Sequence, residues 1–395
     1  MKKILFDGMS LQSANEFAGG SEYSKEILHA LCAGGYTFDV VYNPKRKFPV
    51  DMQKLCEAQH IKRIICTDRK KIPGLLDEGH YDVFFSGVPY EYNKVNFPRN
   101  VRFVYTIHGL RNIETPIDRY FLNYGDLLFK SKTIIKIILN FAWKKGYLAH
   151  QKKKINDLLN ASQNRKIFTD SYHSKYSILN HFPSVDVGQI DVFYAPMSEF
   201  VLSNAVDETV ILNHYGLQAG KYILMLSCNR PEKNCYRGAL ALRELFAAQH
   251  SVMEEIKVVM LGAAHMESIE KIGRQYVGKF ILAGYVEKME LEVLMKNAHL
   301  MLYPTLNEGF GYPPINAMKY GTLSACSAIS SVTEACGDAV LYFNPFDIQE
   351  MKVRILESFD ENIRREKQSQ MIRQYEKIKA LQLEATTKIT AEIAK

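Results

Sequence analysis

Several features that define other classes of protein are missing from this chain of 395 residues. The seven cysteines are an odd number and form no C-x-x-C pair, which argues against a disulfide framework and against a zinc site. No apolar run approaches the roughly 20 residues that are needed to cross a bilayer. The sequence also has no internal repeat and no low-complexity segment. These absences favour a globular protein of a reducing compartment, and we expect a cytoplasmic location.

The composition is ordinary for a globular protein, with 47% hydrophobic and 24% charged residues. The length suffices for two domains, each with its own core. The formal net charge of +7 leaves anionic substrates, a membrane surface and nucleic acid open as partners. At the N-terminus, MKKILFDG has only a short apolar run, so we interpret it as a first strand and not as a signal peptide.

The first half of the chain alternates short apolar strands with helices. These strands show no alternation of apolar and polar residues, as expected of strands that are buried on both faces of a parallel sheet. The pattern predicts a doubly wound α/β domain. Its predicted strands are Lys3–Phe6, Thr37–Tyr42, Val83–Phe85, Val101–Ile107, Lys166–Thr169 and Ile190–Phe193.

The same pattern begins again after a looser connection between Pro196 and Gly220. We therefore predict two Rossmann-like domains, 1–200 and 201–375, that face each other across a cleft, followed by a helix at 376–395 that packs back on the first domain. The predicted strands of the second domain are Tyr222–Leu226, Val258–Leu261, Phe280–Leu282, Leu300–Tyr303 and Leu323–Cys326.

The stretch Tyr303–Gly321, YPTLNEGFGYPPINAMKYG, brings a strand end, a glycine turn and a helix start together. A helix that begins there has unpaired N–H groups and the positive end of its dipole at the turn, which suits a phosphate. Gly309 and Gly311 would let a ligand approach the backbone, and Glu308 adds a carboxylate. The alternative for this stretch alone is a structural turn.

Candidate ligand-binding residues follow three further strands. The carboxyl ends of parallel strands are where ligands of such sheets bind. The pair Gly19-Gly20 precedes a helix, although the spacing is not G-x-G-x-x-G. His108 directly follows a strand, where a packed core histidine is the alternative. Arg230 and Lys233 follow another strand and could neutralise a diphosphate, unless they are simply solvated charges.

The chain resembles the retaining GT-B glycosyltransferases, specifically glycosyltransferase family 4. The most specific match is LMLYPTLNEGFGYPPINAMKYGTLSACSAISSVTEACGDAVLYFNPFD, which spans residues 300–347. Supporting matches are LSCNRPEKN, VVMLG with ILAGYVEKMELEVLMKNA, FVYTIHGL, and IFTDSYHSKYSIL. The resemblance is strong over residues 220–350 and weak before residue 100. It implies an acceptor side in the first domain and a nucleotide-sugar side in the second.

The resemblance also implies a role for each matched position. Glu308 would contact hydroxyls of the donor sugar, and His108 would lie beside that sugar. Arg230 and Lys233 would stabilise the departing nucleoside diphosphate. The other matched positions are expected to meet the diphosphate, base or ribose of the donor: Gly19, Gly20, Tyr285, Val286, Phe310, Gly311, Tyr312 and Asn316.

Two positions depart from the family's pattern. Asn316 stands where the family has a second glutamate that binds the ribose, and an amide can hydrogen-bond there without a charge. Glu232 occupies a position that is arginine in many relatives, so Arg230 would have to supply that positive charge.

The implied reaction moves a glycosyl group from a nucleotide sugar to an acceptor hydroxyl with retention of configuration. Its main electrostatic task is to stabilise the negative charge of the departing diphosphate. No Asp-x-Asp pair occurs in the sequence, so we expect no essential metal and no other cofactor. In this family the leaving phosphate oxygen is thought to take the acceptor's proton, so we name no protein nucleophile.

The basic segment 127–154 has eight lysines, no acidic residue and several large apolar side chains. Such a segment belongs at an anionic membrane surface, which would bring Lys130–Lys154 to the inner face of the membrane and suit a lipid-linked glycan acceptor. A helix with a solvated basic face is the alternative, and both interpretations stay open.

Other functions fit parts of the sequence. A non-catalytic sugar-nucleotide-binding protein would explain Asn316 and Glu232, and a nucleotide-sugar epimerase of the same architecture would need no acceptor. A nucleic-acid-binding protein is not expected, because the basic residues match no recognised motif.

Overall fold

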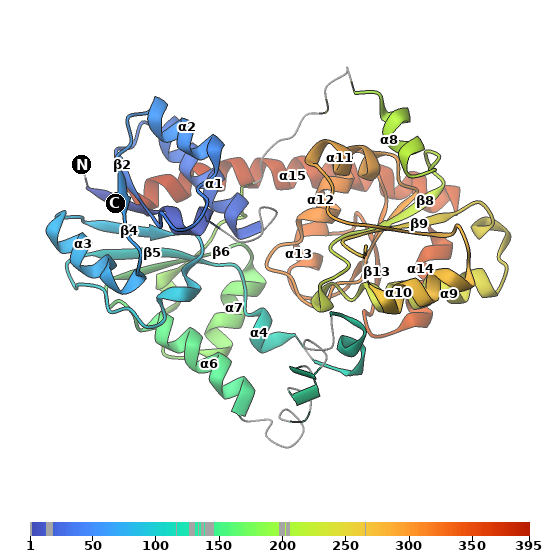
Figure 1. Cartoon of the computed structure of the whole chain (residues 1–395), viewed down its shortest axis with the longest axis horizontal. Coiled ribbons are helices and arrows are strands. Elements are labelled where there is room, and N and C mark those ends of the chain that lie inside the picture. Colours follow the sequence, from blue (N-terminus) through green and yellow to red (C-terminus); the bar gives the residue numbers. More distant parts are fainter. Residues whose placement is uncertain are drawn as a thin grey trace. The chain divides into compact units, whose positions relative to one another are not determined.

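In the computed structural model the chain forms two compact units (Figure 1). The residues that the structure describes are 2–12, 19–115, 117–125, 131–132, 134–135, 138, 146–196, 202, 206–264 and 266–395. The first unit consists of Met1–Ile113, Leu148–Glu199 and Lys379–Lys395. The second unit consists of Glu114–Tyr147 and Phe200–Ile378.

The first unit is built on a parallel sheet of seven strands in the order β3-β2-β1-β4-β5-β6-β7. The strands are β1 (Ile4–Asp7), β2 (Phe38–Tyr42), β3 (Arg63–Ile65), β4 (Val83–Ser86), β5 (Arg102–Ile107), β6 (Arg165–Thr169) and β7 (Ile190–Val192). Its main helices are α1 (Gly19–Ala33), α2 (Val50–Ala58), α3 (Ile72–Glu78), α6 (Gly146–Leu159) and α7 (Tyr172–His181). The short helix α4 (Arg111–Glu114) ends where the second unit begins.

The second unit is built on a parallel sheet of six strands in the order β10-β9-β8-β11-β12-β13. The strands are β8 (Tyr222–Met225), β9 (Lys257–Leu261), β10 (Phe280–Ala283), β11 (Leu300–Tyr303), β12 (Ser324–Ser327) and β13 (Leu341–Phe343). Its helices include α8 (Glu208–His214), α9 (Cys235–Ala247), α10 (Glu267–Gln275), α11 (Lys288–Lys296), α12 (Tyr312–Lys319), α13 (Val332–Cys336) and α14 (Ile348–Glu357).

Burial on both faces explains why the central strands lack alternation. In β8, Ile223 and Met225 pack into one apolar cluster, whereas Tyr222 and Leu224 pack into another. Successive strand residues point to opposite faces of a sheet, so the two clusters cover its two sides. Two parallel-sheet α/β units were predicted, and this fold class is confirmed. All seven cysteines are free thiols, as their spacing predicted.

The predicted strands all form, but β3 and β13 were not predicted. Both are edge strands of only three residues. β3 is partly exposed along its length, and it begins with Arg63 so that only two of its residues are apolar. A strand that is buried on one side only leaves a weaker apolar signal in the sequence.

The segment after α4 differs from the predicted first domain of residues 1–200, because the structure counts Glu114–Tyr147 with the second unit. Tyr124 is 1% exposed and lies in the apolar cluster of that unit. Its hydroxyl accepts a hydrogen bond of 2.9 Å from the backbone N–H of Tyr236. Asp118 forms an ion pair with Arg237. These contacts join residues more than a hundred positions apart, which local sequence patterns do not reveal.

The C-terminal region forms two helices, α14 and α15 (Glu361–Ile393), where the sequence offers no glycine or proline to separate them. The break is made by Asp360, whose carboxylate accepts a hydrogen bond of 2.8 Å from the N–H of Asn362 and so caps α15. The end of α15, Lys379–Lys395, belongs to the first unit. There Gln382 donates a 2.7 Å hydrogen bond to the carbonyl oxygen of Ala195.

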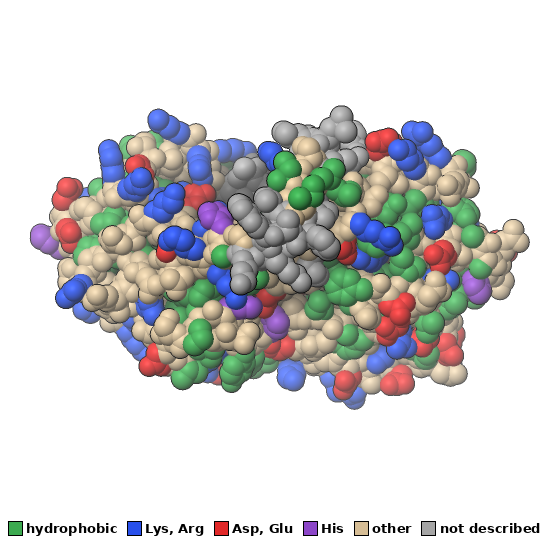
Figure 2. Space-filling model, turned by 90° about the horizontal axis from the view of Figure 1, so that it is seen from below, with side chains coloured by type: hydrophobic (Ala, Val, Ile, Leu, Met, Phe, Trp, Pro, Cys, Tyr) green, Lys and Arg blue, Asp and Glu red, His purple; other side chains and the backbone are tan. Residues whose placement is uncertain are grey.

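Charge is dispersed over the face that Figure 2 shows, where basic and acidic side chains are interspersed. Within the described part of the chain, no helix is both long and apolar enough to cross a membrane. Most of the basic segment 127–145 lies outside the described residues.

His299 connects the sheet of the second unit to the break before α15. Its ring stacks on Phe359 with centroids 4.2 Å apart, and Nε2 lies 3.2 Å from the hydroxyl oxygen of Ser358. Burial, assisted by the positive charge of Arg364, lowers the pKa of His299 to about 4.

We predict that this histidine makes the free energy of unfolding depend on pH. The unfolded chain binds a proton near the ordinary histidine pKa of 6.5, whereas the folded chain binds it only near pH 4. Stability is therefore complete above the unfolded pKa and falls on acidification, by about 2 kcal/mol between about pH 7.5 and about pH 5. Urea unfolding at the two pH values measures the loss.

His299→Phe keeps the ring stack and should remove this part of the pH dependence. The matched control is His250→Gln, a change at an exposed position, which should leave the pH dependence as in the wild type. The same acid loss in His299→Phe as in the wild type would contradict the assignment.

Candidate active site

Glu308 lies at the centre of a buried network in the second unit, in the loop between β11 and α12. Its Oε1 accepts hydrogen bonds from three side chains: Lys233 Nζ at 2.5 Å, the Tyr303 hydroxyl at 2.6 Å and Thr305 Oγ1 at 2.7 Å. The Lys233 and Glu308 side chains are only 9% and 8% exposed. A buried carboxylate needs such partners, because desolvation without them is costly.

The backbone of Glu308 is also held by hydrogen bonds. Its N–H donates to Ser330 Oγ at 3.0 Å, and its carbonyl oxygen accepts from Ser331 Oγ at 2.9 Å. Ser330 has a φ of 48°, an uncommon conformation for a residue other than glycine. The loop after β12 therefore fixes the position of the glutamate.

The turn after Glu308 leads into α12, which begins at Tyr312. Gly311 caps this helix with a φ of 108°, which strains any residue with a Cβ. Phe310 is 3% exposed, so its ring packs inside the unit. Gly311 thus directs the N-terminus of α12 beside the glutamate network.

The basic loop after β8 supplies two cations of different character. Lys233 uses two of its three N–H groups, on Glu308 and on the Tyr303 hydroxyl at 3.1 Å, which leaves a third for an anion. The Arg230 side chain is 37% exposed and contacts Glu232 Oε1 through Nε at 3.0 Å and Nη2 at 2.7 Å. Glu232 therefore offsets the charge of Arg230 instead of adding to it.

Tyr285 contacts the same basic loop after β8. Its hydroxyl donates a 3.1 Å hydrogen bond to Asn229 Oδ1, in the same loop as Arg230. Val286 is half-buried and packs against an apolar cluster of the second unit. Asn316 is half-buried on α12. The hydrogen bond of Tyr285 thus links the end of β10 to the loop after β8, and the ligand contacts of Tyr285, Val286 and Asn316 stay predictions.

His108 is the corresponding feature of the first unit. Its Nδ1 lies 2.6 Å from Asp170 Oδ2, and its Nε2 lies 2.8 Å from the carbonyl oxygen of Gly87. A carboxylate and a carbonyl both accept hydrogen bonds, so two protonated ring nitrogens satisfy this geometry best. Burial lowers the pKa of His108, but Asp170 and the Gly87 carbonyl outweigh it, and the pKa is raised.

Gly20 lies against this histidine at the start of α1. A Cβ on Gly20 would come within 2.9 Å of Val88 Cγ2 and 3.8 Å of His108 Nε2. Gly19 has open space where a Cβ would be. The close approach explains Gly20 without a phosphate but does not explain Gly19, and the predicted phosphate contact stays a prediction.

Sequence reasoning missed the residues that support the predicted ones. Asp170 lies in the matched segment IFTDSYHSKYSIL and directly follows β6, so its place at a strand end was a usable signal. Tyr303, Thr305, Ser330 and Ser331 lie in the matched stretch 300–347. Gly87 acts through its backbone carbonyl, which leaves no side-chain signal.

Residues 216–377 match the family model of the glycosyl transferases group 1. The match includes Arg230, Lys233 and Glu308, so the buried network described above lies inside the group 1 domain. The family resemblance seen in the sequence is confirmed at this level.

The chain is also similar to a curated relative, the O-antigen chain mannosyltransferase B of Escherichia coli, with 25% identity over 228 residues. That match covers 56% of this chain and 58% of the relative, so it spans little more than half of either protein. A match to the serotype-specific mannosyltransferase WbdA of Escherichia coli has 31% identity over 143 residues, 35% of this chain and 17% of WbdA.

Solved structures resemble the chain over its whole length. A glycosyltransferase of Rickettsia africae has a TM-score of 0.65 and 16% identity, with 100% of this chain and 99% of that one covered. HepE of Anabaena, solved with UDP and glucose, has a TM-score of 0.61 and 14% identity, with 100% and 98% covered. At this identity the likeness shows the fold alone, which is that of the GT-B glycosyltransferases.

We predict that Asp170→Asn lowers the pKa of His108, because the amide keeps the shape of the side chain but removes the negative charge that favours the imidazolium. An NMR titration of the His108 ring protons measures the pKa in both proteins. Asp191→Asn on β7 is the matched control, since that carboxylate pairs with Lys166 at 2.9 Å. A His108 pKa that is unchanged by Asp170→Asn would show that the carboxylate does not hold the proton.

Proposed function

We propose that this protein transfers a glycosyl group from a nucleotide sugar to a hydroxyl group of a glycan, with retention of configuration. The observation that carries the proposal is the Glu308 carboxylate, fixed by three donors within the group 1 domain and next to the N-terminus of α12. The names of the curated relatives support a role in polysaccharide assembly and a mannosyl donor. The UDP and glucose bound by HepE support a nucleotide sugar.

In the proposed reaction the bond between the anomeric carbon and the phosphate oxygen breaks, and a bond from that carbon to the acceptor oxygen forms. The acceptor's proton goes to the leaving phosphate oxygen. Arg230, the free N–H of Lys233 and the α12 N-terminus stabilise the charge that develops on the diphosphate. Glu308 orients the sugar through its hydroxyls. No metal is required for these roles.

Two details of the site favour a second candidate, a sugar-nucleotide-binding protein without activity. Glu232 offsets part of the charge of Arg230, and Asn316 replaces a family carboxylate. An epimerase of the same architecture is a third candidate. Acceptor-dependent release of nucleoside diphosphate identifies the transferase, binding without turnover identifies the second candidate, and an altered nucleotide sugar without release identifies the third.

Contact with an anionic membrane through residues 130–154 remains part of the proposal. Ile134, Ile135 and Ile138, which are among the described residues of this segment, are 45%, 55% and 57% exposed. Exposed isoleucines among lysines suit the headgroup region of a membrane. Failure to sediment with anionic vesicles would remove this contact and leave the transfer reaction unaffected.

We predict that Glu308→Gln lowers the rate of transfer by about a hundredfold or more, because the amide keeps the volume and loses the charge that orients and stabilises the reacting sugar. Transfer is measured as acceptor-dependent release of nucleoside diphosphate from a panel of nucleotide sugars, with GDP-mannose and UDP-glucose included. Far-UV circular dichroism at the assay temperature shows that the variant is folded.

Glu270→Gln is the matched control, since Glu270 forms an ion pair with Arg274 one turn further along α10. It should keep wild-type transfer. Wild-type rates in a folded Glu308→Gln protein would contradict the role of the carboxylate, and an inactive wild type across the panel would contradict the proposed function.

A further inference from the structure

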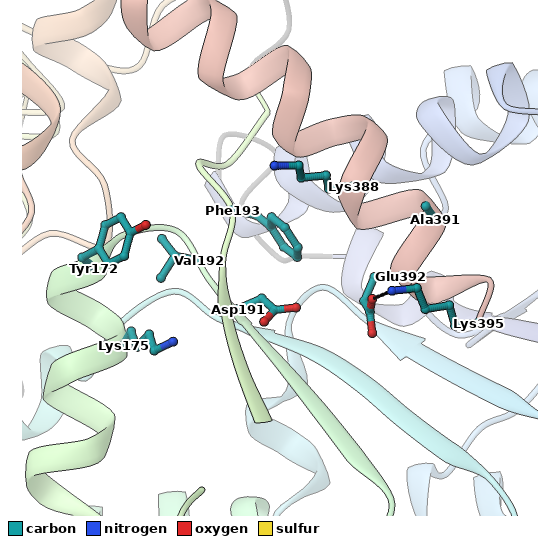
Figure 3. Close-up of a pocket in the computed structure, with 9 residues that line it drawn as sticks. All are labelled: Tyr172, Lys175, Asp191, Val192, Phe193, Lys388, Ala391, Glu392 and Lys395. Carbon is teal, nitrogen blue, oxygen red and sulfur yellow. Dashed lines mark hydrogen bonds and ion pairs between the residues drawn. The ribbon is translucent and has the colours of Figure 1, made fainter. Parts of the chain in front are cut away.

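A cavity of about 420 Å³ opens at the edge strand β7 of the first unit. Figure 3 shows side chains from three elements around it: α7, β7 with the residue that follows, and the end of α15. Phe193 and Asp191 lie on the side of β7 that faces α15, and Tyr172 lies beside Val192. Among the residues that the structure describes, all those that line the cavity belong to the first unit.

The register of the sheet relates this cavity to His108. Ile107 of β5 pairs with Thr169 of β6, and Thr169 pairs with Val192 of β7. The next residues on the three strands are His108, Asp170 and Phe193. Since neighbouring strands lie about 4.8 Å apart, Phe193 follows its strand about 10 Å along the same carboxyl edge from His108. That distance is of the order of a disaccharide.

The first turn of α7 connects the residue that holds His108 with the cavity. Asp170, which holds His108, is followed by Ser171, the N-cap of α7, and then by Tyr172, which lines the cavity. Tyr172 is 55% exposed although it is a large aromatic residue. Phe193 packs edge-on against Phe168 with ring centroids 5.0 Å apart, which fixes its orientation.

The carboxylates around the cavity are each paired with a cation. Lys395 pairs with Glu392 at 2.5 Å, Asp191 pairs with Lys166 at 2.9 Å, and Lys388 pairs with Glu384 at 2.5 Å. Glu392 also pairs with Arg102, and Lys175 donates to the carbonyl oxygen of Ile190 at 2.8 Å. The cavity therefore presents paired carboxylates together with lysine N–H donors.

These paired groups can still make further hydrogen bonds beside the two aromatic rings, since an ammonium has three donors and a carboxylate has about four acceptor sites. A pyranose ring has that complementary character, because its hydroxyl groups donate and accept hydrogen bonds and its C–H face packs on an aromatic ring. The backbone of an edge strand offers further donors and acceptors. β7 has only three residues, which is short for pairing with a strand of another protein.

We propose that this cavity binds a neutral sugar residue of the glycan acceptor, beyond the residue that receives the transferred sugar. The inference rests on the proposed transfer to a glycan and adds a second subsite to it. Tyr172 and Phe193 supply the aromatic surface, and α15 closes the other side. An acceptor long enough to reach the cavity binds more tightly than one that ends near His108.

Isothermal titration with linear mannooligosaccharides, from disaccharide to hexasaccharide, tests this with the full chain and without a donor. We expect the affinity to rise with length by about fivefold to tenfold and then to level off, as contact with aromatic surface predicts. Tyr172→Ala should remove this gain with length. Ala391→Phe, which fills the cavity from α15, should remove it independently if Tyr172→Ala fails to fold.

Tyr176→Ala is the matched control. Tyr176 lies one turn further along α7, is 61% exposed and does not line the cavity, so its removal should preserve the gain with length. Wild-type protein that binds no oligosaccharide, or binds all lengths equally, would overturn the proposal. So would a gain with length that survives in both Tyr172→Ala and Ala391→Phe.

Transfer to a monosaccharide acceptor, assayed in parallel with the wild type, separates this proposal from the proposed function. Length-dependent binding in a protein without transfer would refute the function and keep the cavity as a glycan site. Transfer without length-dependent binding would keep the function and refute the subsite.

Discussion

The buried ion pair between Lys233 and Glu308 is the constraint on which the second unit's site depends. The two side chains come from different strand ends of the sheet, those of β8 and β11, and meet at 2.5 Å with less than a tenth of either exposed. Removing one partner of such a pair leaves a charge buried without compensation, which costs about 3–5 kcal/mol. Tyr303 and Thr305 complete the carboxylate's partners, so the loop that carries Glu308 and the turn into α12 have one favourable arrangement.

In both units the candidate site residues lie at the carboxyl edge of a parallel sheet. In the second unit this edge carries Arg230, Lys233 and the turn before α12. In the first it carries His108, Asp170 and the cavity at Phe193, at the ends of three neighbouring strands. Each site couples a buried carboxylate to a cation, since Glu308 binds Lys233 and Asp170 binds His108. Such pairs keep a charged group in a fixed position while water is excluded.

The sequence predicted the two parallel-sheet units because buried strands leave continuous apolar runs, as at Leu300–Tyr303. It did not predict β3 or β13, since an edge strand of three residues leaves only a short apolar run, which in β3 also begins with Arg63. Glu308, Lys233 and His108 could be proposed because motifs place them at strand ends. Asp170 and the attachment of Tyr124 to the second unit depend on contacts between distant residues. The pairing of Lys233 with Glu308, two residues predicted to serve a ligand separately, also emerged only from the structure.

Binding of a nucleoside diphosphate is the measurement that tests the account most directly. We predict that one member of a panel of nucleoside diphosphates and nucleotide sugars, at about a hundred times its Kd, raises the unfolding temperature by about 2–4 °C. Arg230→Ala should lower that shift, because we propose that its guanidinium contacts the diphosphate, whereas Arg274→Ala, a change on the surface of α10, should preserve it. If no nucleotide of the panel stabilises the wild-type protein, the account of this site is contradicted.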